Sequence, residues 1–215
     1  MKEEIILKNI NLIYDSVITL KDINITLDVT KGAIYIIRGE SASEKSSLIN
    51  ILGLNESPTS GIIEFPSSWY QDNETIKKQY IGMVHHLNGQ NKMKAYEHLI
   101  VPLLDDDINS KDGFEKHVFK TFERFGLEDR MDHYLSELTR QEKQKLQLAR
   151  ALIYNPRILL LDQLFGDMDD GVIQIIERLK QGGHTIIIAT QTKAYDDLAD
   201  YVYCLSQGEL KKYEW

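Results

Sequence analysis

The chain has 215 residues, and its 25 Lys and Arg against 33 Asp and Glu give a formal net charge of −8. This balance argues against a protein that grips nucleic acid through a broad basic surface. At 42% hydrophobic residues the chain can bury a core, which excludes wholesale disorder. No apolar run approaches the roughly 18–20 residues that span a bilayer, and the acidic Glu3 and Glu4 are unlike a signal peptide.

Strands dominate the first part of the chain. β-branched residues cluster or alternate over residues 5–10 and 20–27, as in strands, and the apolar run 33–37 is typical of a buried strand. Small and polar residues then predict a loop over 39–44. Apolar residues at helical spacing predict a helix over 45–54.

The middle of the chain is predicted to be helical. Phe114, Val118, Phe122 and Phe125 recur at steps of four, four and three, which marks an amphipathic helix. Residues 95–104 are a second helical candidate. We therefore expect a helical insert over about residues 87–140.

The last third alternates helices and strands. In chain order, the predictions are a helix over 141–153, a strand over 158–161, a helix over 172–180, a strand over 185–189, and a terminal hairpin of 201–205 and 209–213. Apolar strands that alternate with helices predict a buried parallel sheet in an α/β core. The single cysteine, Cys204, has apolar neighbours and is predicted to be a small core residue in a reducing compartment.

Residues 39–47, Gly-Glu-Ser-Ala-Ser-Glu-Lys-Ser-Ser, lie between a predicted buried strand and a helix, where a phosphate-binding loop belongs. In such a loop backbone N–H groups wrap the phosphates, the Lys reaches the terminal ones, and the Ser hydroxyl binds Mg²⁺. The candidate binding residues are Gly39, Ser41, Ser43, Lys45, Ser46 and Ser47, with Ser46 also a candidate Mg²⁺ ligand.

Glu44 replaces the second glycine of this motif. A carboxylate about 4–5 Å from a phosphate costs roughly 3–4 kcal/mol per unit of like charge at an effective dielectric near 20. Alternatively, Glu44 points to solvent and simply favours the start of the helix, or Glu40 or Glu44 pairs with Lys45 and occupies the anion site. Lys45 could itself be an ordinary surface lysine, although a cation in a first helical turn opposes the helix dipole.

Two later segments carry further motifs. Residues 138–142, Leu-Thr-Arg-Gln-Glu, stand at a predicted helix start and are followed by Leu-Ala-Arg-Ala-Leu over 148–152. The apolar strand 158–161 then carries Asp162 to its carboxyl end, where a carboxylate can hold Mg²⁺ through water.

In the order and spacing of these motifs, the chain resembles the nucleotide-binding subunit of an ATP-binding cassette (ABC) transporter. Residues 98–104 and 128–138 are similar to the lipoprotein-releasing and macrolide-exporter branch. The resemblance implies a P-loop NTPase-type α/β fold with a parallel-sheet core, an antiparallel β part and a helical subdomain insert, all in a single domain over residues 1–215.

The resemblance also assigns candidate nucleotide contacts. Tyr14 matches the aromatic residue that stacks on adenine, although an aromatic residue at a strand end is an equal reading. Thr139 matches the hydroxyl that the signature loop presents to the nucleotide of the opposite subunit, or it is an ordinary N-cap. Arg140 and Gln141 put bulk where the family has glycines.

Three catalytic positions of the family carry other residues here. His86 stands where a Gln is usual, Gln163 where a Glu polarises the attacking water, and Gln191 where a His contacts the γ-phosphate. A neutral amide can orient water but is a very poor proton acceptor. The pair His85-His86 has no partner ligand at a recognisable spacing and is better read as two strand-end histidines.

These substitutions predict a hydrolysis-deficient pseudo-ATPase whose binding of ATP and Mg²⁺ is weak or lost. Its expected partners are a second ABC cassette, more plausibly a different chain than a copy, and a membrane permease that holds it at the cytoplasmic face; no nucleic acid is expected. The alternative is an active but slow ABC-type ATPase. A P-loop kinase is disfavoured because a helical insert followed by a signature-like segment is not a kinase arrangement.

Overall fold

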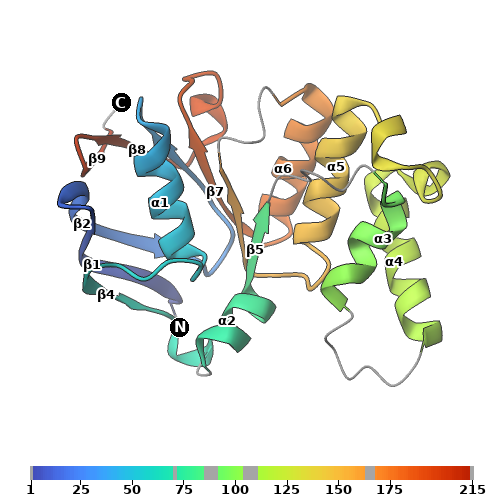
Figure 1. Ribbon diagram of the computed structural model, residues 1–215, viewed down its shortest axis with the longest axis horizontal. Coiled ribbons are helices and arrows are strands. Elements are labelled where there is room, and N and C mark those ends of the chain that lie inside the picture. Colours follow the sequence, from blue (N-terminus) through green and yellow to red (C-terminus); the bar gives the residue numbers. More distant parts are fainter. Residues whose placement is uncertain (1, 70–71, 85–91, 104–110, 163–167, 214–215) are drawn as a thin grey trace.

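The computed structural model describes residues 2–69, 72–84, 92–103, 111–162 and 168–213. The strands are β1 (Glu4–Tyr14), β2 (Val17–Asp28), β3 (Ile34–Arg38), β4 (Ser60–Glu64), β5 (Ile81–Val84), β6 (Ile158–Leu161), β7 (Thr185–Thr190), β8 (Tyr201–Ser206) and β9 (Glu209–Lys212) (Figure 1). The helices are α1 (Ala42–Leu52), α2 (Asn73–Tyr80), α3 (Ala95–Ile100), α4 (Lys111–Phe125), α5 (Arg140–Ala151) and α6 (Asp170–Gln181). Short 3-10 helices are η1 (Ser67–Trp69), η2 (Val101–Leu103), η3 (Glu128–Arg130), η4 (Leu135–Glu137) and η6 (Asp196–Leu198).

A parallel sheet forms the centre of the molecule. Its strand order is β5-β6-β7-β3-β8-β9, in which the first five strands are parallel and β9 is antiparallel to β8. Arg38 at the end of β3 lies opposite Thr190 at the end of β7, and Leu161 of β6 lies opposite Ile188. The segments that follow β3, β6 and β7 therefore leave the sheet at the same edge.

A second, antiparallel sheet has the order β2-β1-β4. β1 and β2 are joined by a two-residue turn in which Asp15 and Ser16 have φ angles of 44° and 68°. Both residues of a type I′ turn need positive φ, and short polar residues tolerate it best. The turn pairs Tyr14 with Val17 at the tip of the hairpin.

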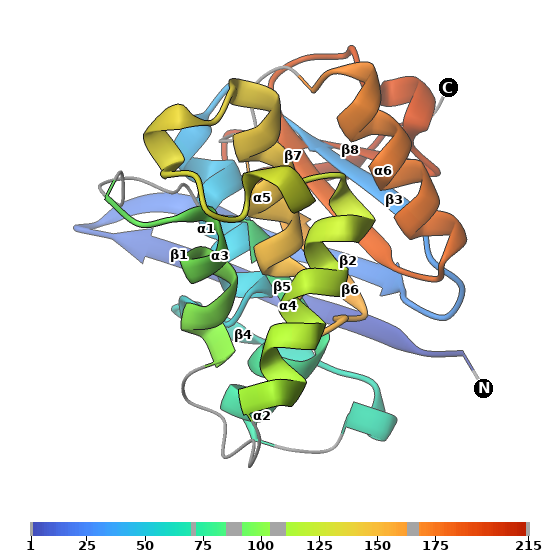
Figure 2. The same cartoon turned by 90° about the vertical axis from the view of Figure 1, so that its right-hand side faces the viewer.

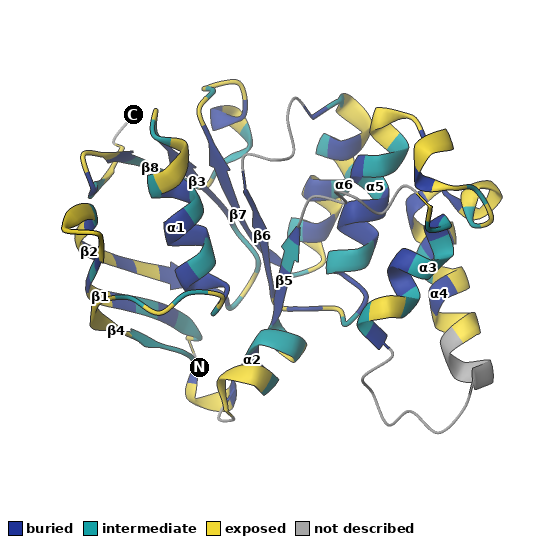
Figure 3. Cartoon of the chain, in the orientation of Figure 1, coloured by how far each residue is buried: buried dark blue, intermediate teal, exposed yellow. Residues whose placement is uncertain are grey.

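The core has two parts, one on each face of the parallel sheet. Ile34 and Ile36 of β3 pack with residues of α4, α5 and α6, whereas Tyr35 and Ile37 pack with α1 and the antiparallel sheet. This division follows from the alternation of side chains along a strand. Figure 3 shows β6 and β7 buried along their length. Figure 2 shows α3 and α4 beside α5, on the side away from the antiparallel sheet.

The fold class predicted from the sequence is confirmed, and the boundaries differ in a few places. α1 begins at Ala42, earlier than predicted, because Ser41 already caps the helix. The predicted helix over 95–104 is α3 followed by η2, because Pro102 interrupts regular α-helical hydrogen bonding. β4 and α2 were not predicted. In the described part of the chain, none of the helices has the length and apolar character needed to cross a membrane.

Candidate functional site

The predicted phosphate loop leaves the parallel sheet between β3 and α1. The Gly39 N–H donates to the Thr190 carbonyl of β7 at 3.2 Å. A Cβ atom at Gly39 would lie 2.3 Å from the Leu205 carbonyl oxygen of β8, so no other residue fits without moving the backbone. The loop is thereby fixed against both neighbouring strands.

The start of α1 is capped from within the loop. The Ser41 hydroxyl accepts a hydrogen bond from the Glu44 N–H at 3.3 Å and lies 3.1 Å from the Ser43 hydroxyl. Ser43 is exposed and Ser46 is half-buried, so both can reach a ligand, whereas Ser47 is buried. Ser47 is therefore the one predicted serine of the loop whose side chain is packed inside the protein and is not accessible to a ligand.

Lys45 is not a surface lysine. Its side chain is buried, and its ammonium donates to the Gly39 carbonyl at 2.5 Å and to the Ser41 carbonyl at 2.8 Å. Burial lowers the pKa of the Lys45 ammonium, and the negative charges of Asp162 and Glu44 act in the opposite direction. Asp162 follows β6, so the end of this strand lies within range of charge interaction with the first turn of α1.

Glu44 is half-buried in the first turn of α1. Its Oε2 atom is shielded from solvent and has no hydrogen-bond partner within the described residues. Neither Glu44 nor the exposed Glu40 forms an ion pair with Lys45 in this part of the chain, because the ammonium is bonded to loop carbonyls instead. The prediction that one of these acids occupies the anion site by pairing with Lys45 is therefore wrong for this structure.

Two further predicted residues lie at the same edge. Asp162 follows β6 and is buried. Gln191 follows β7, is exposed, and donates from its amide Nε2 to the Glu40 carbonyl of the loop at 3.0 Å. His86 and Gln163 lie outside the described residues. The topology of the sheet thus brings Gly39, Asp162 and Gln191 to one edge.

Sequence reasoning missed a buried ion pair at the base of the loop. The Arg38 guanidinium pairs with the Asp196 carboxylate, and both side chains are about nine-tenths buried. Arg38 also contacts the Cys204 Sγ atom at 3.5 Å and the Tyr213 ring at 5.0 Å from its centre. The signal was a charged residue at the end of an otherwise apolar strand. Cys204 is half-buried beside this pair, not a fully buried core residue.

In the segment at the signature position, Thr139 and Glu142 are hydrogen-bonded to each other in a capping box. Thr139 is the N-cap of α5: its hydroxyl accepts from the Glu142 N–H at 3.2 Å and donates to the Glu142 carboxylate at 2.9 Å. The same carboxylate accepts from the Thr139 N–H at 2.8 Å and from the Arg130 Nε at 2.7 Å. These donors, the Thr139 N–H first, lower the pKa of Glu142 to about 2. The reading of Thr139 as an N-cap is confirmed.

Tyr14 stands at the exposed tip of the β1–β2 hairpin. Its side chain is 48% exposed, and Val17 and Ile18 beside it are 65% and 57% exposed. An exposed aromatic residue among apolar neighbours can stack on a planar ligand.

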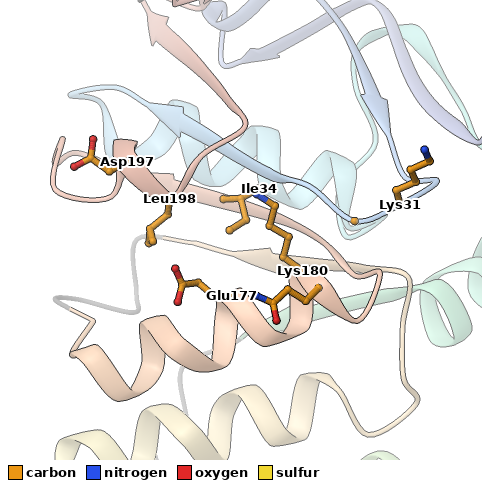
Figure 4. A pocket seen from close by; sticks show the side chains of 8 residues that line it. Lys31, Ile34, Glu177, Lys180, Asp197 and Leu198 are labelled. Atoms are coloured by element: carbon orange, nitrogen blue, oxygen red, sulfur yellow. The ribbon is translucent and has the colours of Figure 1, made fainter.

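A separate cleft of about 400 Å³ lies at the opposite end of β3, between α6 and the segment that follows β7 (Figure 4). Its labelled lining residues are Lys31, Ile34, Glu177, Lys180, Asp197 and Leu198. Lys180 is bound to Asp200 at 2.7 Å. No predicted site residue lines this cleft, so it is separate from the phosphate loop.

The types of residue around the phosphate loop are those that bind a magnesium nucleotide. A helix start, a buried lysine, a half-buried serine and a buried carboxylate are the groups that such a ligand requires. They would be Lys45 and the backbone of α1 for the phosphates, with Ser46 and Asp162 for the metal. Among the residues that the structure describes, no cluster of three or more His, Cys, Asp or Glu side chains could hold a metal ion.

Comparisons with known proteins agree with this geometry. A family model described as "ABC transporter" matches residues 23–166. The chain is 31% identical over 218 residues to the lipoprotein-releasing system ATP-binding protein LolD of Rickettsia felis, covering 96% of each chain. It is 36% identical over 172 residues to the protein of the same name from Rickettsia conorii, covering 77% of this chain and 76% of the relative.

Solved structures give the same result for the fold. The dimeric structure of MJ0796, a bacterial ABC transporter cassette, superposes with a TM-score of 0.81 at 25% identity, covering 98% of this chain and 99% of the other. A dimeric post-hydrolysis state of the same cassette, bound to ADP and Pi, gives a TM-score of 0.80 at the same identity and coverage.

Proposed function

The chain belongs to the ABC transporter ATP-binding family, and from that premise we propose that it is a cassette that binds a magnesium nucleotide but hydrolyses it very slowly or not at all. Gln191 is the observation that carries this proposal. Its amide lies at the edge of the phosphate loop and is bonded to the loop backbone at 3.0 Å. A neutral amide in this place, where the family has a His that contacts the γ-phosphate, cannot take up a proton at neutral pH.

The nucleotide would lie along the edge formed by α1 and the ends of β3, β6 and β7. Lys45 and the backbone of the first turn of α1 would hold its phosphates, and Tyr14 would stack on its base. Mg²⁺ would bind Ser46 directly and Asp162 through water. When bound, the ion neutralises phosphate charge. Each of these tasks is binding or positioning, and the chain retains a residue for each.

Hydrolysis requires a group that accepts a proton from the attacking water. Gln163 stands directly after Asp162 and carries a neutral amide, as Gln191 does. Loss of a general base typically slows a reaction by about 10²–10⁴-fold. The effects of replacing two groups that act together do not multiply. We therefore expect the hydrolysis rate to be about as low as the loss of the general base alone would make it.

A cassette of this kind would act with other subunits. The relatives from Rickettsia are named as ATP-binding proteins of a lipoprotein-releasing system, and the MJ0796 structures are described as dimeric. We therefore propose that this chain forms one domain over residues 1–215 with a helical subdomain of about 87–140, and pairs with a second cassette. A membrane permease would hold it at the cytoplasmic face.

A different, intact second cassette is favoured over a copy of this chain. In a homodimer both nucleotide sites would combine Gln163 and Gln191 with the closed α5 start, in which Thr139 is already bonded in both directions to Glu142. In a heterodimer, one site would combine Gln163 and Gln191 with the signature loop of the partner, and the other would combine the α5 start with the phosphate loop of the partner, so neither site would carry all of these changes.

An active but slow ATPase, with turnover sufficient to energise transport, is the second candidate function. Lys45 and Asp162 support it as far as binding is concerned, because both are charged groups buried at the edge of the sheet where the phosphates would lie. The two candidates make the same prediction for binding and differ only in the rate of phosphate release.

Titration of the isolated chain with ATP in the presence of Mg²⁺, followed by calorimetry, tests the binding proposal. We expect saturable binding of one nucleotide per chain with an affinity weaker than micromolar. No heat of binding up to millimolar ATP would contradict the proposal.

Purification from the native cell tests the partners: recovery of neither a second cassette nor a membrane protein would contradict the transporter role.

A further inference from the structure

Glu44 is the residue of the phosphate loop that neither the fold nor the proposed binding role explains. It lies in the first turn of α1, next to Lys45, and its side chain is half-buried. The Oε2 atom has no hydrogen-bond partner within the described residues although it is shielded from solvent. Burial of a carboxylate oxygen without a partner is unfavourable, so the placement of this oxygen carries a cost in stability.

Glu44 adds a negative charge to the loop at the position where the motif has a neutral glycine. Lys45 interacts electrostatically with both Glu44 and Asp162, so one positive and two negative charges lie together. The Lys45 ammonium donates to the Gly39 and Ser41 carbonyls and keeps its charge inside the loop. Compared with a loop that has glycine at this position, an incoming anion therefore meets one additional negative charge.

This additional charge penalises ligands according to their own charge. A magnesium-bound nucleoside triphosphate carries one more negative charge than the corresponding diphosphate. At about 7 Å and an effective dielectric near 20, one additional like charge weakens binding on the order of tenfold or more. Screening by salt reduces this figure only modestly for a carboxylate whose oxygen is buried.

The hydrogen bonds at the start of α1 also disfavour the binding of a terminal phosphate. The Glu44 N–H, one of the donors that a glycine here would turn to a phosphate, is already bonded to the Ser41 hydroxyl. Gln191, which is neutral, is bonded to the Glu40 carbonyl at the entrance of the loop. A terminal phosphate would gain no opposing positive charge from either residue.

From these contacts we infer that Glu44 is a specificity-determining residue, and that it makes the loop favour magnesium-bound nucleoside diphosphates over triphosphates. The inference rests on the proposed nucleotide binding and deepens it by naming the class of ligand. The opposite role is also chemically open to a carboxylate: if Glu44 were a ligand of Mg²⁺, it would favour the triphosphate complex, and the two roles predict opposite effects of removing its charge.

Calorimetric titration with MgADP and MgATP separates these roles. In the unmodified chain, MgADP should bind at least as tightly as MgATP. Glu44→Gln, which keeps the shape and removes the charge, should tighten MgATP about tenfold more than it tightens MgADP. The matched control is Glu40→Gln, because Glu40 is an exposed acid of the same loop; it should shift both affinities by the same small factor and leave their ratio unchanged.

Two other results would contradict the inference, and only the second would also contradict the proposed function. An unchanged ratio in Glu44→Gln, or weaker MgATP binding, would overturn the inference and leave the proposed nucleotide binding intact. Absence of binding of both nucleotides to the chain and to both variants would overturn the proposed function, and the inference with it.

Thermal unfolding without nucleotide provides a readout that is independent of binding. Because Glu44 has a buried oxygen without a partner, Glu44→Gln should melt at the same temperature as the unmodified chain or higher. A melting temperature several degrees lower would show that the carboxylate has a stabilising partner, and would overturn the electrostatic argument.

Discussion

α1 and α5 both begin with a hydroxyl N-cap, Ser41 and Thr139, yet their first turns differ in what they leave for a ligand. At α5 the capping box is complete, because the Glu142 carboxylate accepts from Thr139 and from Arg130. At α1 the Ser41 oxygen takes one N–H, and a buried lysine lies behind the turn. A helix start whose acid is already bonded to the cap is structural, whereas one with a buried lysine in its first turn is suited to an external anion.

The supports of the two helix starts differ in the same way. Arg38–Asp196 lies at the base of the α1 loop, with side chains 10% and 11% exposed, whereas Arg130–Glu142 at α5 has side chains 44% and 20% exposed. Removing one partner of a buried pair leaves an uncompensated charge, but exposed pairs contribute little. The phosphate loop is therefore the more rigidly anchored of the two.

The largest expected effect comes from breaking the buried pair. Arg38→Met leaves the Asp196 carboxylate buried without its partner, and should lower the free energy of unfolding by about 3–5 kcal/mol in urea titration. Arg38→Met combined with Asp196→Leu removes both charges and should recover most of this loss. A single variant that loses under about 1 kcal/mol would show that the pair does not anchor the loop.

Lys45→Ala should have the next largest effect, on binding. It removes the buried cation of the α1 start, so the affinity for magnesium nucleotide should fall about 100-fold or more. Calorimetry with the unmodified chain and with Thr139→Ala, whose site is the α5 start, provides the comparison. Equal losses in the two variants would contradict the distinction between the two helix starts.

Thr139→Ala should affect folding instead of nucleotide affinity in the isolated chain. It removes the hydroxyl that caps α5 and should cost about 1 kcal/mol of unfolding free energy, the usual range for an N-cap. Chemical denaturation measures the loss. A variant with unaltered stability but weaker nucleotide binding would mean that Thr139 acts as a ligand contact within its own chain.

The last expected effect concerns the dependence of stability on pH. Hydrogen bonds from Thr139 and Arg130 lower the pKa of Glu142 from 4.5 to about 2 in the folded chain. Its contribution to stability is therefore complete above about pH 4.5 and is lost as the pH falls toward 2. In acid titrations, Glu142→Gln should be less stable than the unmodified chain near neutrality, and this difference should shrink below pH 4.5. A constant difference would contradict the account of the cap.

The sequence predicted the strands and helices that form the edge of the site because their signals are local. The apolar runs that became β3, β6 and β7 end at Arg38, Leu161 and Thr190, next to the residues singled out as functional. The motif order placed Gly39, Lys45 and Asp162 in the site because a parallel sheet carries its loops to one edge.

The sequence did not indicate which distant residues pair with one another. Arg38 and Asp196 are separated by 158 positions, and nothing in either segment alone indicates that they pair. The bond from Gln191 to the Glu40 carbonyl spans 151 positions in the same way. Sequence reasoning left the orientation of Glu44 open, because first-turn side chains point toward solvent or ligand according to the fold around them. His86 and Gln163 lie outside the described residues, and their roles remain predictions.

The rate of phosphate release from MgATP by the purified chain tests the central claim most directly. With neutral amides at positions 163 and 191, we predict negligible steady-state turnover, below about 1 s⁻¹, even at saturating nucleotide. The variant Lys45→Ala sets the background of the assay. Release well above about 1 s⁻¹ that disappears in Lys45→Ala would contradict the account, because it would show that this chain alone completes the hydrolytic step.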